Sequence, residues 1–306
     1  TDVTIEDSVN PTAVCQNITV ELDANGEATI TAADVDGGSS DGCGGTVSLF
    51  INTTYFDCND LGANNVLFIV TDESLNSSSC TAIVTVVDVI DPTITCAADQ
   101  TQNLDAGLCT ADVTVVGPTI SDNCSVASIT NDFNNTADAS DDYPVGTTTV
   151  TWTLTDGSGN TSTCTQDIVV TDNQPPVLVC QDITVELDAN GEVSITENDL
   201  IVSINDCSTI ATYTITPRSD FDCVHLGDNN ITLFAQDAAG NLAFCASVVT
   251  VVDNIAPTIV SIPGDISVNN DSGACGAVVS WTEPTTTDNC SSTISQTTGV
   301  ANGLEF

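Results

Sequence analysis

The feature that most constrains this chain is a thirteen-residue pattern that recurs at nearly constant spacing. An alternating apolar run ends at Asp, and Pro follows four residues later, in VTIEDSVNPTAVC (3–15), VTVVDVIDPTITC (84–96), IVVTDNQPPVLVC (168–180) and VTVVDNIAPTIVS (249–261). Successive prolines, at positions 11, 92, 176 and 257, lie 81, 84 and 81 residues apart. This regularity predicts a tandem array of one structural unit. Because proline fixes φ and lacks an N–H, it suits the first residue of an edge strand and stiffens the joint.

The repeat also predicts module boundaries. Residues 1–7 are interpreted as the last strand of a preceding module, followed by module 1 (8–88), module 2 (89–172), module 3 (173–253) and module 4 (254–306, incomplete). QDITVELDANGEVSIT in module 3 repeats QNITVELDANGEATIT in module 1, and TDNC in module 4 repeats SDNC in module 2. The chain is therefore expected to alternate between two module types, A-B-A-B.

Each module is expected to be a β-sandwich of the immunoglobulin type. Short alternating runs rich in β-branched residues are separated by turn signals such as Asn25-Gly26, which gives about seven strands per module and an all-β fold class. One strand face in each complete module is predicted to enter the core, and both tryptophans are interpreted as core residues of strands. These residues are Val66, Phe68, Val70, Val150, Trp152, Leu154, Ile231, Leu233, Ala235 and Trp281.

The charge balance limits the possible partners. The chain carries 43 acidic residues and one basic residue, Arg218, for a formal net charge of −42. This charge excludes nucleic acid as a partner and disfavours anionic membranes, whereas divalent cations suit it as counter-ions. Because 41% of the residues are hydrophobic, we expect a folded protein rather than a disordered acidic one. The sequence contains no run of about 20 apolar residues, so no membrane span is predicted. No signal peptide is recognisable at the start.

Fourteen cysteines without a CxxC pair indicate disulfides and an oxidising, extracellular or cell-surface location. Cys180, Cys223 and Cys245 match Cys15, Cys58 and Cys80 at an offset of 165 residues. Since module 4 keeps two cysteines of the type B layout, the simplest pairing closes every bond within its own module. The predicted bonds are Cys15–Cys80, Cys43–Cys58, Cys96–Cys164, Cys109–Cys124, Cys180–Cys245, Cys207–Cys223 and Cys275–Cys290.

The cysteine positions suggest a cation site. Eight residues separate Cys15 from Asp23 and also Cys80 from Asp88. If these cysteines are bonded and the first and last strands run parallel, the two carboxylates emerge together, and they repel unless a cation lies between them. We therefore expect Ca²⁺ at the module joints, held by oxygen ligands; the alternative is a plain hairpin turn with solvated loop aspartates. The candidate ligands are Asp23, Asn25, Asp88, Asp91, Asp105, Asp122, Asp156, Asn160, Asp172, Asp188, Asn190, Asp253 and Asp288.

The type B modules resemble a known family. The pattern P-T-I-x-C, D-N-C, P-V-G-T-T-T-V-T-W and T-D-G-S-G-N-T-S-T-C in module 2 resembles the hyalin repeat (HYR) domain. The L-D-A-N-G-E and S-S-D-G-C motifs of type A look like related units of giant surface adhesins in Bacteroidetes, including gliding adhesins. The resemblance implies an immunoglobulin-like fold, export to the cell surface and a role in adhesion or extracellular filaments, with no catalytic residues. Ser261 stands where the pattern has its first cysteine, and the type A modules fit it only loosely.

Three functions remain open from the sequence. The first is a structural and adhesive stalk, whose partners are neighbouring modules, identical chains in a filament, or a surface glycan or protein. The second is an array of glycan- or ligand-binding modules, and the third is a non-catalytic extension of a secreted enzyme. The single histidine, His225, is not a repeated feature and is interpreted as a surface-loop residue, so no enzyme is expected.

Overall fold

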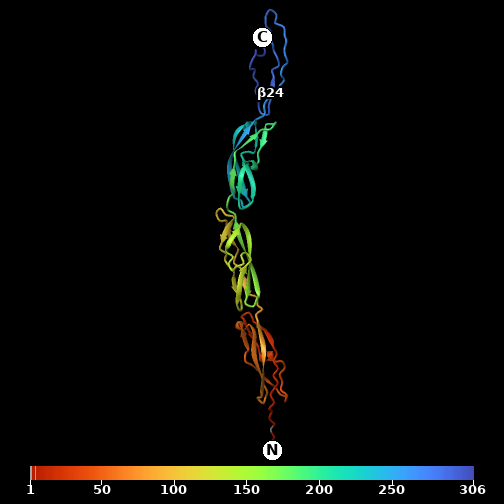
Figure 1. The fold of residues 1–306 in the computed structure, drawn as a ribbon, viewed down its shortest axis with the longest axis vertical. Helices are drawn as coiled ribbons and strands as arrows, with labels where there is room; N and C mark the ends of the chain where they lie inside the picture. Colours follow the sequence, from red (N-terminus) through yellow and green to blue (C-terminus); the bar gives the residue numbers. More distant parts are fainter. Residues whose placement is uncertain (1, 4) are drawn as a thin grey trace. The chain divides into compact units, whose positions relative to one another are not determined.

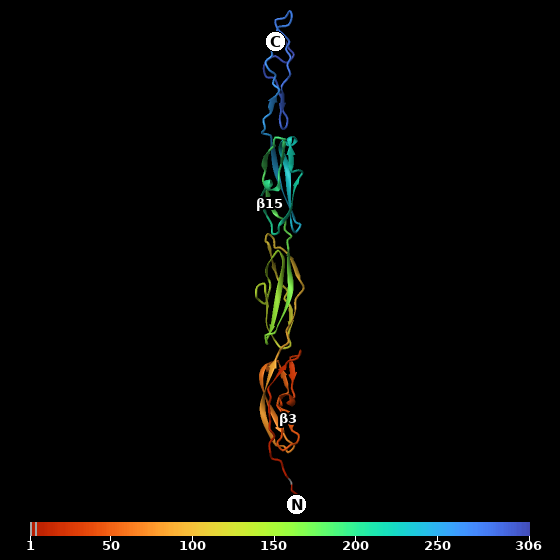
Figure 2. The same ribbon diagram turned by 90° about the vertical axis from the view of Figure 1, so that its right-hand side faces the viewer.

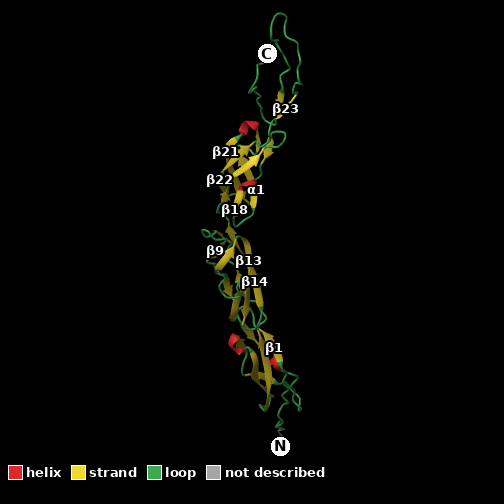
Figure 3. Ribbon diagram, turned by 45° about the horizontal axis from the view of Figure 1, so that its top comes forward, coloured by secondary structure: helices red, strands yellow, loops and turns green. Residues whose placement is uncertain are grey.

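The computed structural model describes residues 2–3 and 5–306, and strands dominate it (Figure 3). Residues 1 and 4, which fall in the predicted strand at 1–7, lie outside the described residues, and the described residues of that range form no strand. The chain divides into two compact units, Thr1–Asp105 with Thr110–Thr171, and Ala106–Cys109 with Asp172–Phe306. Modules 1 to 4 denote the residue ranges predicted from the repeat.

Module 1 lies in the first unit and is a two-layer β-structure (Figure 1). Its elements are β1 (Ile18–Glu21), β2 (Glu27–Thr29), η1 (Ala32–Val35), β3 (Ser48–Ile51), β4 (Tyr55–Asp57), η2 (Cys58–Asp60), β5 (Gly62–Thr71) and β6 (Ser77–Val87). One sheet has the order β1-β6-β5-β3, and β2 pairs with β4 in the other layer. The first strand, β1, runs parallel to the last, β6, as expected from the sequence.

Module 2 repeats this plan, and its strands lie in the same unit. Its strands are β7 (Thr93–Thr95), β8 (Gln100–Asn103), β9 (Thr110–Val113), β10 (Thr119–Ser121), β11 (Val126–Asn131), β12 (Asp141–Pro144), β13 (Gly146–Asp156) and β14 (Thr161–Thr171). The main sheet has the order β11-β13-β14-β8, with β8 parallel to β14, and the pairs β7–β10 and β9–β12 supply the rest. The long antiparallel pair β13–β14 is seen from two sides in Figures 1 and 2.

Modules 3 and 4 lie in the second unit. Module 3 has β15 (Val177–Cys180), β16 (Ile183–Glu186), β17 (Glu192–Ser194), α1 (Glu197–Leu200), β18 (Ile201–Asn205), β19 (Ile210–Thr216), β20 (Asp220–Asp222), η3 (Cys223–His225), β21 (Gly227–Asp237) and β22 (Leu242–Val252). Its main sheet, β16-β22-β21-β19, matches that of module 1. In module 4, β23 (Thr258–Val260) pairs with β24 (Thr285–Thr287). None of the described helices is long and apolar enough to cross a membrane.

The predicted core is confirmed in modules 1, 2 and 3. Along β5, Val66, Phe68 and Val70 are fully buried, and the corresponding residues of β13 and β21 are buried as well. Trp152 on β13 is 1% exposed. The prediction for Trp281 is wrong, because this residue lies outside any strand, is only half-buried and lines an open pocket of about 410 Å³. The only histidine, His225, is in η3 beside Asp222 rather than in the core.

Three disulfides staple the two layers of single modules. Cys15–Cys80, Cys96–Cys164 and Cys180–Cys245 each connect the segment that opens a module with its last long strand, β6, β14 or β22. These bonds join pairs expected from the sequence. They close loops of 65 to 68 residues, and each such bond contributes about 2–4 kcal/mol to the stability of a small domain. The thin aliphatic cores of these modules benefit from that contribution.

Candidate cation clusters and intermodule disulfides

Three aspartates from separate segments meet in the first unit. Asp88 directly follows β6, Asp122 follows β10, and Asp156 ends β13. One carboxylate oxygen from each lies within 4.8 Å of the others. Asp88 and Asp156 are 6% and 2% exposed, so these carboxylates are largely removed from water. The cluster therefore combines the residue that ends module 1 with two loop residues of module 2.

The protein's own hydrogen bonds fix the position of each carboxylate. Asp156 Oδ1 accepts backbone N–H groups from Ser158, Gly159 and Asn160 at 2.7–2.9 Å. The Asn160 amide donates to Asp156 Oδ2 at 2.7 Å and to the Asp88 carbonyl at 3.2 Å, which holds the linker against the loop. Burial alone would raise the pKa of Asp156, but these hydrogen bonds outweigh it and lower the pKa.

Several oxygens in the cluster are left open. Asp88 Oδ1 accepts from Ile90 N and Asn123 Nδ2, and Asp122 Oδ2 accepts from Cys124 N. Among the residues that the structure describes, no donor reaches the buried Asp88 Oδ2, Asp122 Oδ1 or Asn123 Oδ1. Two carboxylates at most 4.8 Å apart repel by at least about 3.5 kcal/mol at an effective dielectric constant of about 20. The chain has one basic side chain in total, so lysine and arginine offer little to offset this repulsion. Oxygen donors of this kind suit a hard divalent cation.

The second unit contains the same arrangement. Asp172, Asp206 and Asp237 each bring a carboxylate oxygen within 4.8 Å of the others, and Asp237 is 2% exposed. The Asn241 amide donates to Asp237 Oδ2 at 2.8 Å and to the Asp172 carbonyl at 3.3 Å, as Asn160 does in the first cluster. Asp172 Oδ2 is buried, and no hydrogen-bond donor from the described parts of the chain reaches it.

A third group lies at the corresponding end of module 1. It consists of Asp7, Asp41 and the exposed Cys43. Both carboxylate oxygens of Asp41 are buried, and the described residues supply no donor to either. A hydrogen bond to Asp7, burial and the negative charges of Asp7 and Asp41 raise the pKa of the Cys43 thiol.

The structure does not bring the turn residues of the sequence prediction into these clusters. The exposed Asp23 accepts the N–H groups of Asn25 and Glu27 on Oδ1, and the Asn25 amide contacts its Oδ2. These backbone hydrogen bonds lower the pKa of Asp23. In the same way, Glu192 and Asn190 lower the pKa of Asp188. The carboxylates of Asp23 and Asp188 stabilise their own turns, which corrects the expected placement of both aspartates and of Asn25 and Asn190.

The other predicted candidates also lie outside the three-residue clusters. Asp91 is exposed, and Asp105 Oδ2 accepts the Asp112 N–H at 3.0 Å. Asp253 and Asp288 accept the N–H groups of Ile255 and Cys290. Within residues 2–3 and 5–306, neither belongs to a group of three potential ligands.

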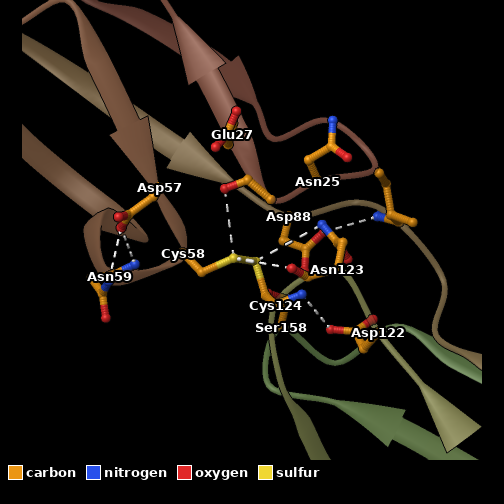
Figure 4. The surroundings of a disulfide bond; sticks show 12 residues. Asn25, Glu27, Asp57, Cys58, Asn59, Asp88, Asp122, Asn123, Cys124 and Ser158 are labelled. Atoms are coloured by element: carbon orange, nitrogen blue, oxygen red, sulfur yellow. Dashed lines mark hydrogen bonds between the residues drawn. A yellow bond between two sulfur atoms is a disulfide. The ribbon is translucent and has the colours of Figure 1, made fainter.

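The loop residues that follow Asp122 of the first cluster are bonded to module 1. Cys58, the first residue of η2, forms a disulfide with Cys124 (Figure 4). Asn123 Nδ2 donates to the Asp23 carbonyl at 3.2 Å. Gly26 has φ +75° in the Asp23–Gly26 turn. A Cβ on Gly26 would lie 2.6 Å from both the Asn123 carbonyl oxygen and Cys58 Sγ. Glycine is therefore required here by backbone conformation and by close approach together.

Four predicted disulfides are wrong for a common reason. Cys58 pairs with Cys124, Cys109 with Cys207 and Cys223 with Cys290, so the expected bonds Cys43–Cys58, Cys109–Cys124, Cys207–Cys223 and Cys275–Cys290 do not form. Cys43 and Cys275 are free and exposed. The prediction assumed that each module closes its own cysteines. In the structure, the other six cysteines lie at module ends, and the partner of each belongs to the adjacent module.

The sequence did contain a signal for the missed aspartates. Asp88 and Asp122, Asp172 and Asp206, and Asp7 and Asp41 are each 34 residues apart. A third aspartate follows 31 residues after the second one in two of these pairs: Asp237 follows Asp206, and Asp72 follows Asp41. This spacing in the repeats identifies Asp7, Asp41, Asp206 and Asp237, which the local motif Asp-Ala-Asn-Gly did not.

Comparisons with known proteins agree with the repeat character. Residues 87–170 match the family model of the HYR domain. The chain is 32% identical over 237 residues to hyalin of Strongylocentrotus purpuratus, which covers 74% of this chain and 20% of that protein. It is 31% identical over 241 residues to hyalin of Lytechinus variegatus, with 75% and 44% coverage. The match therefore spans about a fifth of the first relative's length and less than half of the second's. A Bacteroidetes origin stays a prediction.

Two solved structures that match this chain are distant from it in sequence. A protocadherin gammaB7 EC3-6 structure covers 90% of this chain and 83% of its own, with 16% identity and a TM-score of 0.33. The mouse cadherin-23 EC22-24 structure covers 80% and 99%, with 13% identity and a TM-score of 0.36. The nearly all-β tandem architecture itself is established by the sheets described above. The matches to relatives support an HYR repeat at residues 87–170, within a chain that is similar to hyalin over about three quarters of its length.

Proposed function

We propose that this chain is a structural and adhesive stalk segment of an extracellular repeat protein, stiffened at its module joints by disulfides and Ca²⁺. Similarity to hyalin and the HYR match support an extracellular adhesive repeat. The disulfides agree with an oxidising environment outside the cytoplasm. Neighbouring modules, identical chains, or a surface glycan or protein are the partners of such a segment.

The observation that carries the calcium proposal is the recurrence of open, buried carboxylate oxygens. Asp88 Oδ2 and Asp172 Oδ2 occupy corresponding positions in two clusters, and both lack a donor among the described residues. Ca²⁺ accepts six to eight oxygen ligands in irregular geometry, whereas Mg²⁺ requires near-ideal octahedral geometry. Carboxylates from a linker and two loops form an irregular set, which favours Ca²⁺.

A cation at the first cluster would restrict the linker. Asp88 ends the β6 segment, whereas Asp122 and Asp156 belong to loops of module 2. The Asn160 amide already holds the Asp88 carbonyl. A Ca²⁺ ion between the carboxylates would therefore replace mutual repulsion with attraction and oppose bending at this joint.

The segment has no catalytic role in this proposal. The acidic groups recur at successive joints instead of marking one site, which suits repeated structural use. His225 Nδ1 accepts the backbone N–H of Asp222 within its own turn. The Asp222 carboxylate lies 2.7 Å from the same nitrogen, so both contacts of His225 Nδ1 are local to this turn.

Calorimetric titration of the chain with Ca²⁺ tests the proposal. We expect saturable binding, and Asp88→Asn should abolish or weaken one class of sites because it removes a ligand charge from the first cluster. Asp91→Asn is the matched control, since Asp91 lies three residues further along the same linker but is exposed and outside the cluster. An isotherm without saturable heat, or equal loss in both variants, would contradict the calcium assignment.

A further inference from the structure

The cysteines outside the three intramodule bonds fall into two repeated classes. Each module has one cysteine that closely follows its loop aspartate, and we call these the loop cysteines: Cys43, Cys124, Cys207 and Cys290. Each module also has one cysteine in a turn or at the start of a short 3₁₀ helix. We call these the end cysteines: Cys58, Cys109, Cys223 and Cys275. The repeat offsets relate them, because Cys207 matches Cys43 at 164 residues and Cys275 matches Cys109 at 166.

The observed bonds follow one rule. Cys58–Cys124, Cys109–Cys207 and Cys223–Cys290 each join the end cysteine of one module to the loop cysteine of the next. Their Cα–Cα distances are 5.4, 5.1 and 5.3 Å, within the normal range for disulfides. The rule covers both orders of module type, since two bonds run from type A to type B and one from type B to type A.

The two cysteines left over are one of each class. Cys43 is a loop cysteine and Cys275 is an end cysteine, and both are free and exposed. The turn that carries Cys275 has the geometry of the turn that carries the bonded Cys109. Gly107 and Gly273 have φ +77° and +81°, and Asp105 N and Asp271 N donate to the carbonyls of Thr110 and Gly276 at 3.0 and 2.8 Å.

We propose that Cys43 and Cys275 are complementary halves of a further intermodule disulfide. Cys43 takes the end cysteine of a type B module, and Cys275 takes the loop cysteine of a type A module. A second copy of this chain offers both of these partner cysteines, and the two copies are then joined head to tail through Cys275–Cys43. The two thiols lose two protons and two electrons as the S–S bond forms, and a disulfide oxidant such as oxidised glutathione accepts them and becomes two thiols.

Two single variants test this pairing. Cys43→Ser keeps only Cys275 free, and Cys275→Ser keeps only Cys43 free, so each alone forms only symmetric dimers. Both positions are exposed and unbonded, so neither change removes a bond of the folded chain. The variants are mixed in equal amounts with reduced and oxidised glutathione and analysed by non-reducing electrophoresis. Pepsin digestion and mass spectrometry then identify the linked peptides, since the chain has too few basic residues for trypsin.

The proposal predicts that the mixed Cys43–Cys275 dimer exceeds the sum of the two symmetric dimers. The unaltered chain should form a ladder of reducible oligomers, and the double variant should stay monomeric. Random pairing makes the mixed dimer equal to that sum, and this result, or thiols that remain unpaired, would overturn the proposal.

Disulfide mapping of the protein isolated from its producing cells under alkylating conditions distinguishes the two sources of a partner. Linkage of Cys43 to the Cys275 peptide indicates a second copy, whereas linkage to another cysteine peptide indicates a further module. An alkylated, unpaired Cys43 would again overturn the proposal. These readouts do not depend on Ca²⁺, so their outcome is independent of the calcium binding in the proposed function.

Discussion

Replacing Asp122 by Asn should have opposite effects on stability with and without Ca²⁺. Without a cation, Asp122 lies within 4.8 Å of two other carboxylates, and each such pair repels by at least about 3.5 kcal/mol at an effective dielectric constant of about 20. Asparagine removes this charge, and its carbonyl oxygen can still accept the Cys124 N–H that Asp122 Oδ2 accepts at 3.0 Å. Its amide also offers a donor to the open Asp88 Oδ2. In chelator, Asp122→Asn should therefore be more stable than the unaltered chain.

With Ca²⁺ the order should reverse. A ligand present at about 100 times its Kd stabilises the folded state by about 2.7 kcal/mol, and the variant loses much of this gain because one carboxylate ligand is gone. For domains of this size, each kcal/mol corresponds to about 4–8 °C in Tm. Differential scanning calorimetry in EDTA and in excess Ca²⁺ measures both differences.

Asp91→Asn is the control for this experiment, because it removes the same charge from an exposed position outside the cluster. It should change stability by no more than about 0.5 kcal/mol in either condition. If Asp122→Asn lowers Tm in chelator, the carboxylate acts only as a structural acceptor. If Ca²⁺ raises the Tm of Asp122→Asn as much as that of the unaltered chain, the cluster does not bind the ion. Either result refutes the reasoning.

Three further predictions concern the same joint. Gly26→Ala should destabilise the chain in urea by about 1–3 kcal/mol more than Gly62→Ala, because both glycines have positive φ but only Gly26 has atoms within 4 Å of an added Cβ; equal losses would show that the close approach is unimportant. Replacing Cys58 and Cys124 together by Ser should cost about 4 kcal/mol in thermal unfolding, the chain-entropy value for a loop of this length, whereas Cys43→Ser should change little. Since hydrogen bonds outweigh burial and hold the folded pKa of Asp156 below its usual 3.8, its contribution is present above that pH and is lost as pH falls through the lowered value. Asp156→Asn should flatten the acid limb of a stability–pH curve, and an unchanged limb would contradict this assignment.

The sequence by itself determined the all-β fold class of this protein. Strand alternation and the recurring Asp–Pro pattern predicted tandem sandwiches, and the predicted faces around Phe68, Trp152 and Leu233 are buried. The three bonds that staple single modules were also predictable, because they connect segments whose positions the strand order fixes. Periodicity and strand order are local or repeated properties, so one chain is enough to reveal them.

Only the tertiary structure decided which groups meet at the joints. Counting residues along parallel strands placed the backbones near Asp23 and Asp88 together, and Leu22 N does donate to the Val87 carbonyl at 3.0 Å. The count did not fix side-chain direction, and Asp23 turns to the N–H groups of its own turn because these donors are nearest. The choice of Cys124 over Cys43 as the partner of Cys58 likewise depends on how one module end packs on the next. Such contacts join residues far apart in sequence, and no local pattern specifies them.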